Sequence, residues 1–115
     1  MIDLHLVLPY PPSINSYYGR TRTGQVYIKE KGRDYRKHLV DTINSLETFS
    51  ERIQLEVLLF PPDRRRRDLD NILKCLLDAL THSKVYEDDS QIDVLIVKRK
   101  DIIKNGKCEV LITKL

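Results

Sequence analysis

The clearest structural signal in the chain is residues 68–80, DLDNILKCLLDAL. The apolar residues of this stretch recur at intervals of three and four, which places them on one face of a helix. They are Leu69, Ile72, Leu73, Leu76, Leu77 and Leu80. Asp68 stands directly before them, where an N-cap residue is expected. The stretch therefore predicts an amphipathic helix that is long and apolar enough to fill one face of a sheet.

Strands are predicted on both sides of this helix. Alternating apolar residues indicate them over positions 2–8 and 53–60 before the helix, and over 92–99 and 108–114 after it. A second helix is predicted over about residues 30–46, where apolar residues again recur at helical spacing. They are Tyr35, Leu39, Ile43 and Leu46.

These elements predict an α+β fold. We expect a small mixed sheet of about four main strands, packed with two helices. Asn105-Gly106, between the last two predicted strands, is a strong hairpin signal. The length of 115 residues, with no repeat or linker, predicts a single domain over residues 1–115.

Composition excludes several classes of protein. No apolar stretch approaches the roughly 18 residues that a membrane span needs, so no membrane association is expected. The N-terminal residues lack the basic and apolar segments of a signal peptide, which predicts a cytoplasmic protein. Cys75 and Cys108 have no zinc spacing and are expected to be free thiols. No glycine-rich phosphate loop is present, so no nucleotide cofactor is expected.

The net charge of +3 is mild, but part of the positive charge is concentrated in one run. This run is Arg64, Arg65, Arg66 and Arg67, between Asp63 and Asp68. A run of this kind is often only a solvated loop. It can equally hold the phosphates of a nucleic acid.

Carboxylates follow the arginine run. Asp68 and Asp70 would point to nearly opposite sides of a helix, but they can turn toward one point if Asp68 is a non-helical cap. Lys74 follows Asp70 at the i+4 position, and Asp88 and Asp89 lie in the connection after the helix.

Acids beside a basic run suit phosphodiester cleavage. Mg²⁺ prefers oxygen ligands and is typically held by one or two carboxylates together with a substrate phosphate. A neighbouring lysine can stabilise the charge of the transition state or orient the attacking water. The alternative interpretation is structural: a helix cap at Asp68, a surface ion pair between Asp70 and Lys74, and a solvated turn at residues 88–89.

The string DRRRRDLDN at residues 63–71, followed by Lys74 and the acid pair of residues 88–89, resembles the RusA family of Holliday junction resolvases. The N-terminal LPYPPS of residues 8–13 is also similar to the opening of that family. The likeness extends over nearly the whole chain. In place of a glycine that the family often has after the long helix, this chain has THSK at residues 81–84.

The resemblance implies a RusA-like fold and a homodimeric, Mg²⁺-dependent endonuclease. Such an enzyme cuts four-way DNA junctions by paired symmetric nicks in recombination and repair, and Mn²⁺ is expected to substitute for Mg²⁺. The essential carboxylates of the family fall on Asp68, Asp70 and Asp89, and its catalytic lysine falls on Lys74. Asp88 is the neighbouring acid, which can share the metal or lie just outside its ligands.

The resemblance also implies DNA contacts. The candidates are Arg64, Arg65, Arg66, Arg67, Asn71, Asn15, Tyr17 and Tyr18, with Arg20, Arg22, Lys29 and Arg33 as weaker ones. The two tyrosines can stack on unpaired bases at the crossover, or they can simply pack over the sheet edge.

Two other functions fit the same residues. One is a non-catalytic module that binds junctions or other nucleic acids. The other is a less selective metal-dependent nuclease that cuts flaps or duplex DNA.

Overall fold

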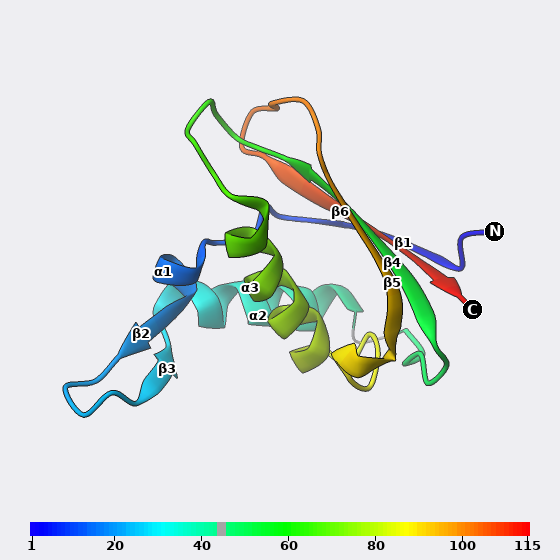
Figure 1. The fold of residues 1–115 in the computed structure, drawn as a ribbon, viewed down its shortest axis with the longest axis horizontal. Helices are drawn as coiled ribbons and strands as arrows, with labels where there is room; N and C mark the ends of the chain where they lie inside the picture. The colour runs from blue at the N-terminus through cyan, green and yellow to red at the C-terminus, as the bar shows by residue number, and fades with distance from the viewer. Residues whose placement is uncertain (44–45) are drawn as a thin grey trace.

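The computed structural model describes residues 1–43 and 46–115. Its elements in chain order are β1 (Leu4–Leu8), α1 (Ile14–Tyr17), β2 (Tyr18–Arg20), β3 (Val26–Ile28), α2 (Glu30–Ile43), β4 (Ile53–Phe60), α3 (Leu69–His82), the 3-10 helix η1 (Asp89–Gln91), β5 (Ile92–Arg99) and β6 (Lys107–Lys114). Four strands form the main sheet in the order β1-β6-β4-β5, while β2 and β3 form a separate hairpin. Figure 1 shows the helices on one side of the main sheet and the hairpin extending away from it.

The main sheet is mixed because β4 pairs antiparallel with β6 and parallel with β5. Helix α3 connects the two parallel strands. Alternate residues of β4, from Ile53 to Leu59, are fully buried, as their apolar alternation predicts. The predicted α+β class and the mixed sheet of four main strands are confirmed.

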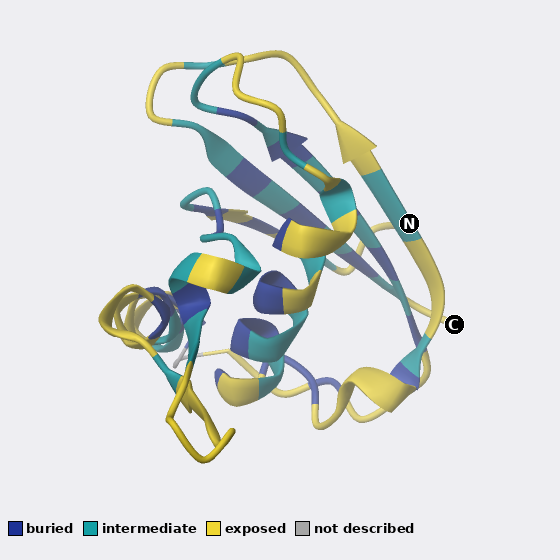
Figure 2. Ribbon diagram, turned by 60° about the vertical axis from the view of Figure 1, so that its left-hand side comes forward, coloured by how far each residue is buried: buried dark blue, intermediate teal, exposed yellow. Residues whose placement is uncertain are grey.

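The core lies between this sheet and the helices. Helix α3 contributes Ile72, Cys75, Leu76, Ala79 and Leu80, all buried (Figure 2). Complete burial of a leucine side chain stabilises the fold by about 1.5–3 kcal/mol, so this face holds α3 firmly against the sheet.

The hairpin predicted between the last two strands is wrong. Asn105 and Gly106 do form a tight turn, with φ of 67° and 65°. However, β4 lies between β5 and β6 in the sheet, so the turn does not join paired strands. Lys100 N still donates to Leu59 O at 2.8 Å on the β5 side of β4. The chain then passes the end of β4, where Ile103 N donates to Pro61 O at 3.0 Å, and reaches β6 on the far side of that strand.

Several predicted boundaries also change. The first strand begins at Leu4 rather than at residue 2, although Asp3 N still donates to Ile112 O at 2.8 Å and the Asp3 side chain accepts from Lys114 N at 2.7 Å. Helix α2 is described to Ile43, and part of its predicted end, residues 44–45, lies outside the described residues. Leu46 is exposed and does not join the core. Within the described residues, no helix is long and apolar enough to cross a membrane.

Candidate functional site

A cavity of about 420 Å³ lies along α3, and we call it the acid cavity. It is lined by Tyr18, Asp70, Leu73, Lys74, Leu77, Asp78, Thr81, Asp88 and Asp89. Asp70, Lys74 and Asp78 follow one another at intervals of four residues and therefore share one side of α3. The other two acids are Asp88, which directly precedes η1, and Asp89, the first residue of η1. The fold thus brings Asp70, Lys74, Asp88 and Asp89 to one cavity.

A buried amide holds the η1 end of this cavity in place. Gln91 donates from Nε2 to Phe49 O at 3.0 Å and to Glu51 O at 2.8 Å, and its Oε1 accepts from Asp88 N at 2.8 Å. Asp88 in turn caps η1, accepting from Ser90 N at 3.0 Å. This hydrogen bond holds the pKa of Asp88 below its usual value. Asp88 therefore has a structural role, whereas Asp89 presents an exposed carboxylate.

The donor set of the cavity suits a hard cation such as Mg²⁺, because its anionic groups are all carboxylates. In the described part of the chain, no three His, Cys, Asp or Glu side chains are gathered closely enough to hold one ion. Mg²⁺ does not require three, since it commonly keeps several waters and takes one or two carboxylates with a substrate phosphate. The residues are compatible with Mg²⁺, although they do not form a preorganised cage for it.

Lys74 lies at the edge of the acid cavity. Its Nζ is 5.9 Å from the centre of the Tyr18 ring. The surface ion pair considered for Asp70 and Lys74 is not formed between these two described residues. Burial raises the pKa of Tyr18 to about 12, so the Tyr18 hydroxyl is neutral at ordinary pH. The positive charge of Lys74 therefore faces an uncharged ring and the cavity.

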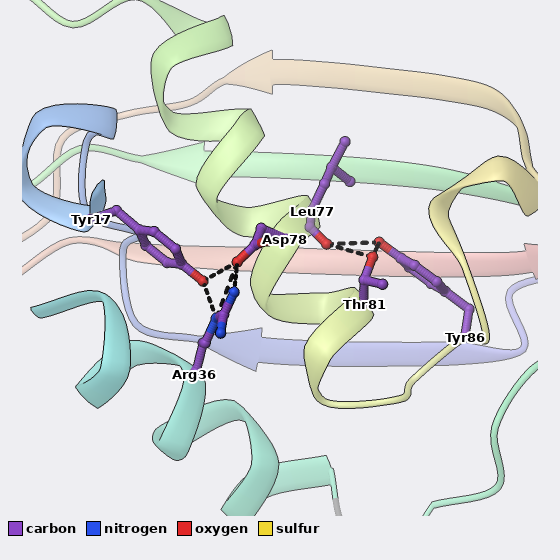
Figure 3. Close-up of polar contacts among 6 residues, drawn as sticks. All are labelled: Tyr17, Arg36, Leu77, Asp78, Thr81 and Tyr86. Atoms are coloured by element: carbon purple, nitrogen blue, oxygen red, sulfur yellow. Dashed lines mark hydrogen bonds and ion pairs between the residues drawn. The ribbon is translucent and has the colours of Figure 1, made fainter. Parts of the chain in front are cut away.

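Sequence reasoning missed Asp78, whose Oδ2 joins three helices (Figure 3). It accepts from the hydroxyl of Tyr17 in α1, and from Nη2 of Arg36 in α2 at 2.7 Å. Its spacing of four residues from Lys74 was a visible signal, but its partners come from segments distant in the chain. Because Arg36 neutralises it, Asp78 adds little net negative charge to the cavity.

The same network decides between the two interpretations of Tyr17. Its side chain is completely buried, and its hydroxyl also accepts a hydrogen bond from Arg36 Nε at 2.8 Å. No face of this ring is open to a base, so Tyr17 has the packing role. Tyr18 is only partly buried and keeps the candidate role in stacking.

Asp68 lies outside the acid cavity. It lines a second hollow of about 500 Å³ with Arg65, Arg66, Arg67 and Asn71. Asp68 occupies the N-cap position of α3 with an extended backbone, but its side chain forms no capping hydrogen bond. The expected cap is therefore absent, and the carboxylate is exposed beside the arginine loop, residues 63–67.

Asp63 organises the arginine loop. Its Oδ1 accepts from Arg65 N at 2.9 Å and from Arg67 Nη1 at 2.7 Å. These bonds lower the pKa of Asp63 to about 2. Arg67 also lies over the Tyr10 ring at 5.6 Å, and only 19% of its side chain is exposed. Arg67 thus shapes the loop, while Arg64, Arg65 and Arg66 are exposed to solvent.

The remaining candidates lie near the β2–β3 hairpin. Asn15 lines a third hollow, which also contains Arg20, Lys29, Tyr18 and Lys74. Arg33 instead donates from Nη1 to Ile28 O at 2.7 Å.

This α+β domain places carboxylates and a lysine on and beside α3, and a run of arginines directly before that helix. Phosphodiester hydrolysis uses side chains of these kinds. Residues 9–113 match the family described as Endodeoxyribonuclease RusA. The chain is 45% identical over 118 residues to the crossover junction endodeoxyribonuclease rusA of Enterobacteria phage HK97, covering 100% of this chain and 98% of the relative. It is 35% identical over 118 residues to the enzyme of the same name from Enterobacteria phage 82, with the same coverage. It is 34% identical over 113 residues to crossover junction endodeoxyribonuclease RusA of Escherichia coli (strain K12), covering 96% of this chain and 93% of the relative. The chain belongs to the RusA family of endodeoxyribonucleases, which confirms the resemblance.

Proposed function

We propose that this protein is a structure-specific endodeoxyribonuclease that resolves four-way DNA junctions during recombination and repair. The observation that carries the proposal is the acid cavity, which Asp70, Lys74 and Asp89 line together although Asp89 is distant in the chain. Family membership supports the reaction class, because the relatives bear the name crossover junction endodeoxyribonuclease. Their bacterial and phage origin supports action in the bacterial cytoplasm.

We propose Mg²⁺ as the cofactor, with Mn²⁺ as a substitute. Asp70 and Asp89 are the first candidates to hold it, with Asp88 beside them. The exposed, uncapped carboxylate of Asp68 is two residues from Asp70 and is free to turn toward the scissile phosphate once DNA is bound. Bound Mg²⁺ would supply charge neutralisation at the phosphate and a more acidic water.

The cationic residues have separate tasks in this proposal. Lys74 adds positive charge at the edge of the acid cavity, where it stabilises the negative charge that develops on the phosphate. The exposed arginines 64–66 hold the phosphates that flank the cut. Asn71 lines the same hollow as Asp68, Arg65 and Arg66, and it can donate to a phosphate oxygen.

We also propose that the protein acts as a homodimer. Resolving a four-way junction requires cuts in two strands, and each described chain presents one acid cavity. Two copies related by a two-fold axis meet this requirement most simply. The leucine-rich side of α3 faces the core, so the helix-free face of the sheet is the better candidate for the interface. Light scattering coupled to gel filtration tests the oligomeric state.

The function is tested with a labelled four-way junction that has partly mobile arms. We expect paired, symmetric nicks with Mg²⁺ or Mn²⁺, and none with EDTA. Asp70→Asn should abolish cutting and preserve binding, because removing a negative charge eases the approach of phosphate. Asp41→Asn is the matched control, since Asp41 is an exposed acid of α2 outside the acid cavity.

Other outcomes favour the other functions. Junction binding without any cut, across several crossover sequences and with both metals, would indicate a binding module. Equal cutting of flaps and linear duplex would indicate a less selective nuclease.

A further inference from the structure

A groove of about 740 Å³ lies between α1 and the β2–β3 hairpin, next to the acid cavity. Tyr18 and Lys74 line both spaces, so the groove and the acid cavity meet at these two side chains. Whatever occupies the acid cavity can therefore continue directly into the groove. The hairpin that forms its outer wall extends from the body of the protein (Figure 1).

The ionic groups that line the groove are all cationic. They are Arg20 on β2, Lys29 after β3 and Lys74 on α3, and no acidic residue of the described chain lines it. Lys29 Nζ donates to Asn15 O at 2.8 Å, which fixes the ammonium at the wall and leaves two of its protons for a ligand. A groove that is lined by three cations and by no acid favours an anionic occupant.

The groove also presents an aromatic face. Tyr27 lies opposite Gly19 in the hairpin, and 47% of Tyr27 is exposed. A Cβ at Gly19 would lie 2.4 Å from Tyr27 Cζ, so the Tyr27 ring can lie against β2 only because residue 19 has no side chain. This contact holds a ring that remains partly exposed to solvent.

We propose that this groove binds unpaired nucleotides of the DNA strand next to the cut, with a base stacked on Tyr27 and phosphates on Arg20 and Lys29. The inference rests on the proposed nuclease function, since the groove opens from the acid cavity. Aromatic rings combined with cations are the means by which proteins hold single strands without sequence preference. An acidic peptide would match the charges as well, but the shared Lys74 and Tyr18 connect the groove to the phosphate-cutting site and favour DNA.

The test measures binding of a labelled single-stranded oligothymidine to the full chain without divalent metal. Stacking of one base contributes about 1–3 kcal/mol, so Tyr27→Leu should weaken binding by about 5- to 150-fold. Tyr27→Phe keeps the ring and should bind like the wild type. Gly19→Ala displaces the ring without removing it and should weaken binding as Tyr27→Leu does.

An exposed lysine of α2 provides a control for the charges. Arg20 lines the groove, whereas Lys37 does not. Arg20→Ala should weaken binding and reduce the slope of log K against log salt by about 0.7, the value for one phosphate of a single strand. Lys37→Ala should leave both the affinity and the slope nearly unchanged.

A second measurement, the fluorescence of a base analogue, tests whether a base at the crossover stacks on Tyr27. A four-way junction with 2-aminopurine at the crossover should lose fluorescence on binding to wild type and to Tyr27→Phe, but not to Tyr27→Leu. Circular dichroism of each variant verifies its fold. If Gly19→Ala does not fold, the comparison of Tyr27→Leu with Tyr27→Phe tests the groove proposal without it.

Unchanged oligothymidine affinity in both Tyr27→Leu and Arg20→Ala would overturn the groove proposal, and so would binding of polyglutamate in preference to DNA. Junction cleavage by the wild type, measured in parallel, separates this failure from failure of the proposed function. If the wild type cleaves junctions but oligothymidine binding does not depend on Tyr27, only the groove proposal is rejected. If binding depends on Tyr27 but no junction is cleaved, only the proposed nuclease function is rejected.

Discussion

Arg36 of α2 donates two hydrogen bonds to Oδ2 of Asp78 in α3, from Nη2 at 2.7 Å and from Nε at 3.1 Å. The hydroxyl of Tyr17 in α1 donates to the same oxygen. One carboxylate oxygen thus ties α1 and α2 to α3, the helix that carries most of the acid cavity. Because Tyr18 follows Tyr17 directly, the network also fixes the position of the ring shared by the acid cavity and the groove.

We predict that Asp78→Ala lowers the free energy of unfolding by about 1–3 kcal/mol, because it leaves a buried tyrosine hydroxyl without its acceptor and Arg36 without its counter-charge. Asp93→Ala is the control, since Asp93 pairs with Arg52 while both side chains remain about half exposed. An exposed pair of this kind contributes only about 0–1 kcal/mol. Urea unfolding of both variants measures the difference. Equal losses would show that the Asp78 network is not a structural centre.

The sequence predicted the parts of the fold that have long periodic patterns. The eight alternating residues of β4 and the leucine stripe of α3 extend over enough positions to define a period. The three-residue strands β2 and β3 and the four-residue helix α1 are too short to do so. The order of β5 and β6 depends on how the segment after Arg99 crosses the end of β4, which a turn signal at residues 105–106 does not encode.

The candidate site was predictable in a similar, partial way. Family resemblance marked Asp70, Lys74 and Asp89, and the fold brings them to one cavity. Asp78 was not recognised, because its partners in α1 and α2 approach it only through tertiary packing. Arg67 shapes the arginine loop through its contacts with Asp63 and the Tyr10 ring. Its position within a run of arginines does not distinguish it from its neighbours in this way.

We predict that the arginines of the loop contribute unequally to DNA binding. Arg64→Ala, Arg65→Ala and Arg66→Ala should each reduce the slope of log K against log salt by about 0.9 on a junction with duplex arms, because each removes one phosphate contact. Arg67→Ala should instead increase the exchange of backbone amides in the loop, since it loses the bond to Asp63. Salt titrations of binding and hydrogen exchange measure the two effects. A slope change for Arg67→Ala without faster exchange would contradict this division.

We predict that both thiols are protected in the folded protein. Cys75 and Cys108 are completely buried, and burial raises the pKa of Cys75 to about 11 and that of Cys108 to about 12. Thiolate is the reactive form, so neither residue should react with a disulfide reagent at neutral pH. Addition of denaturant should release two thiols per chain. Fast reaction of one thiol in the native protein would show that the core opens locally.

We predict that the protein loses stability in alkali through its tyrosines. Burial raises the pKa of Tyr18 to about 12, and it raises the pKa values of Tyr17, Tyr35 and Tyr86 as well. In the unfolded chain these hydroxyls ionise near pH 10, which favours unfolding, whereas the folded chain keeps them neutral. Stability should therefore be complete below about pH 10 and fall as the pH rises through the folded pKa values. Tyrosinate absorbance and circular dichroism are recorded together during an alkaline titration, and the absorbance change of these four rings should coincide with the loss of circular dichroism. Complete ionisation near pH 10 with the circular dichroism unchanged would mean that these rings are not held in the core.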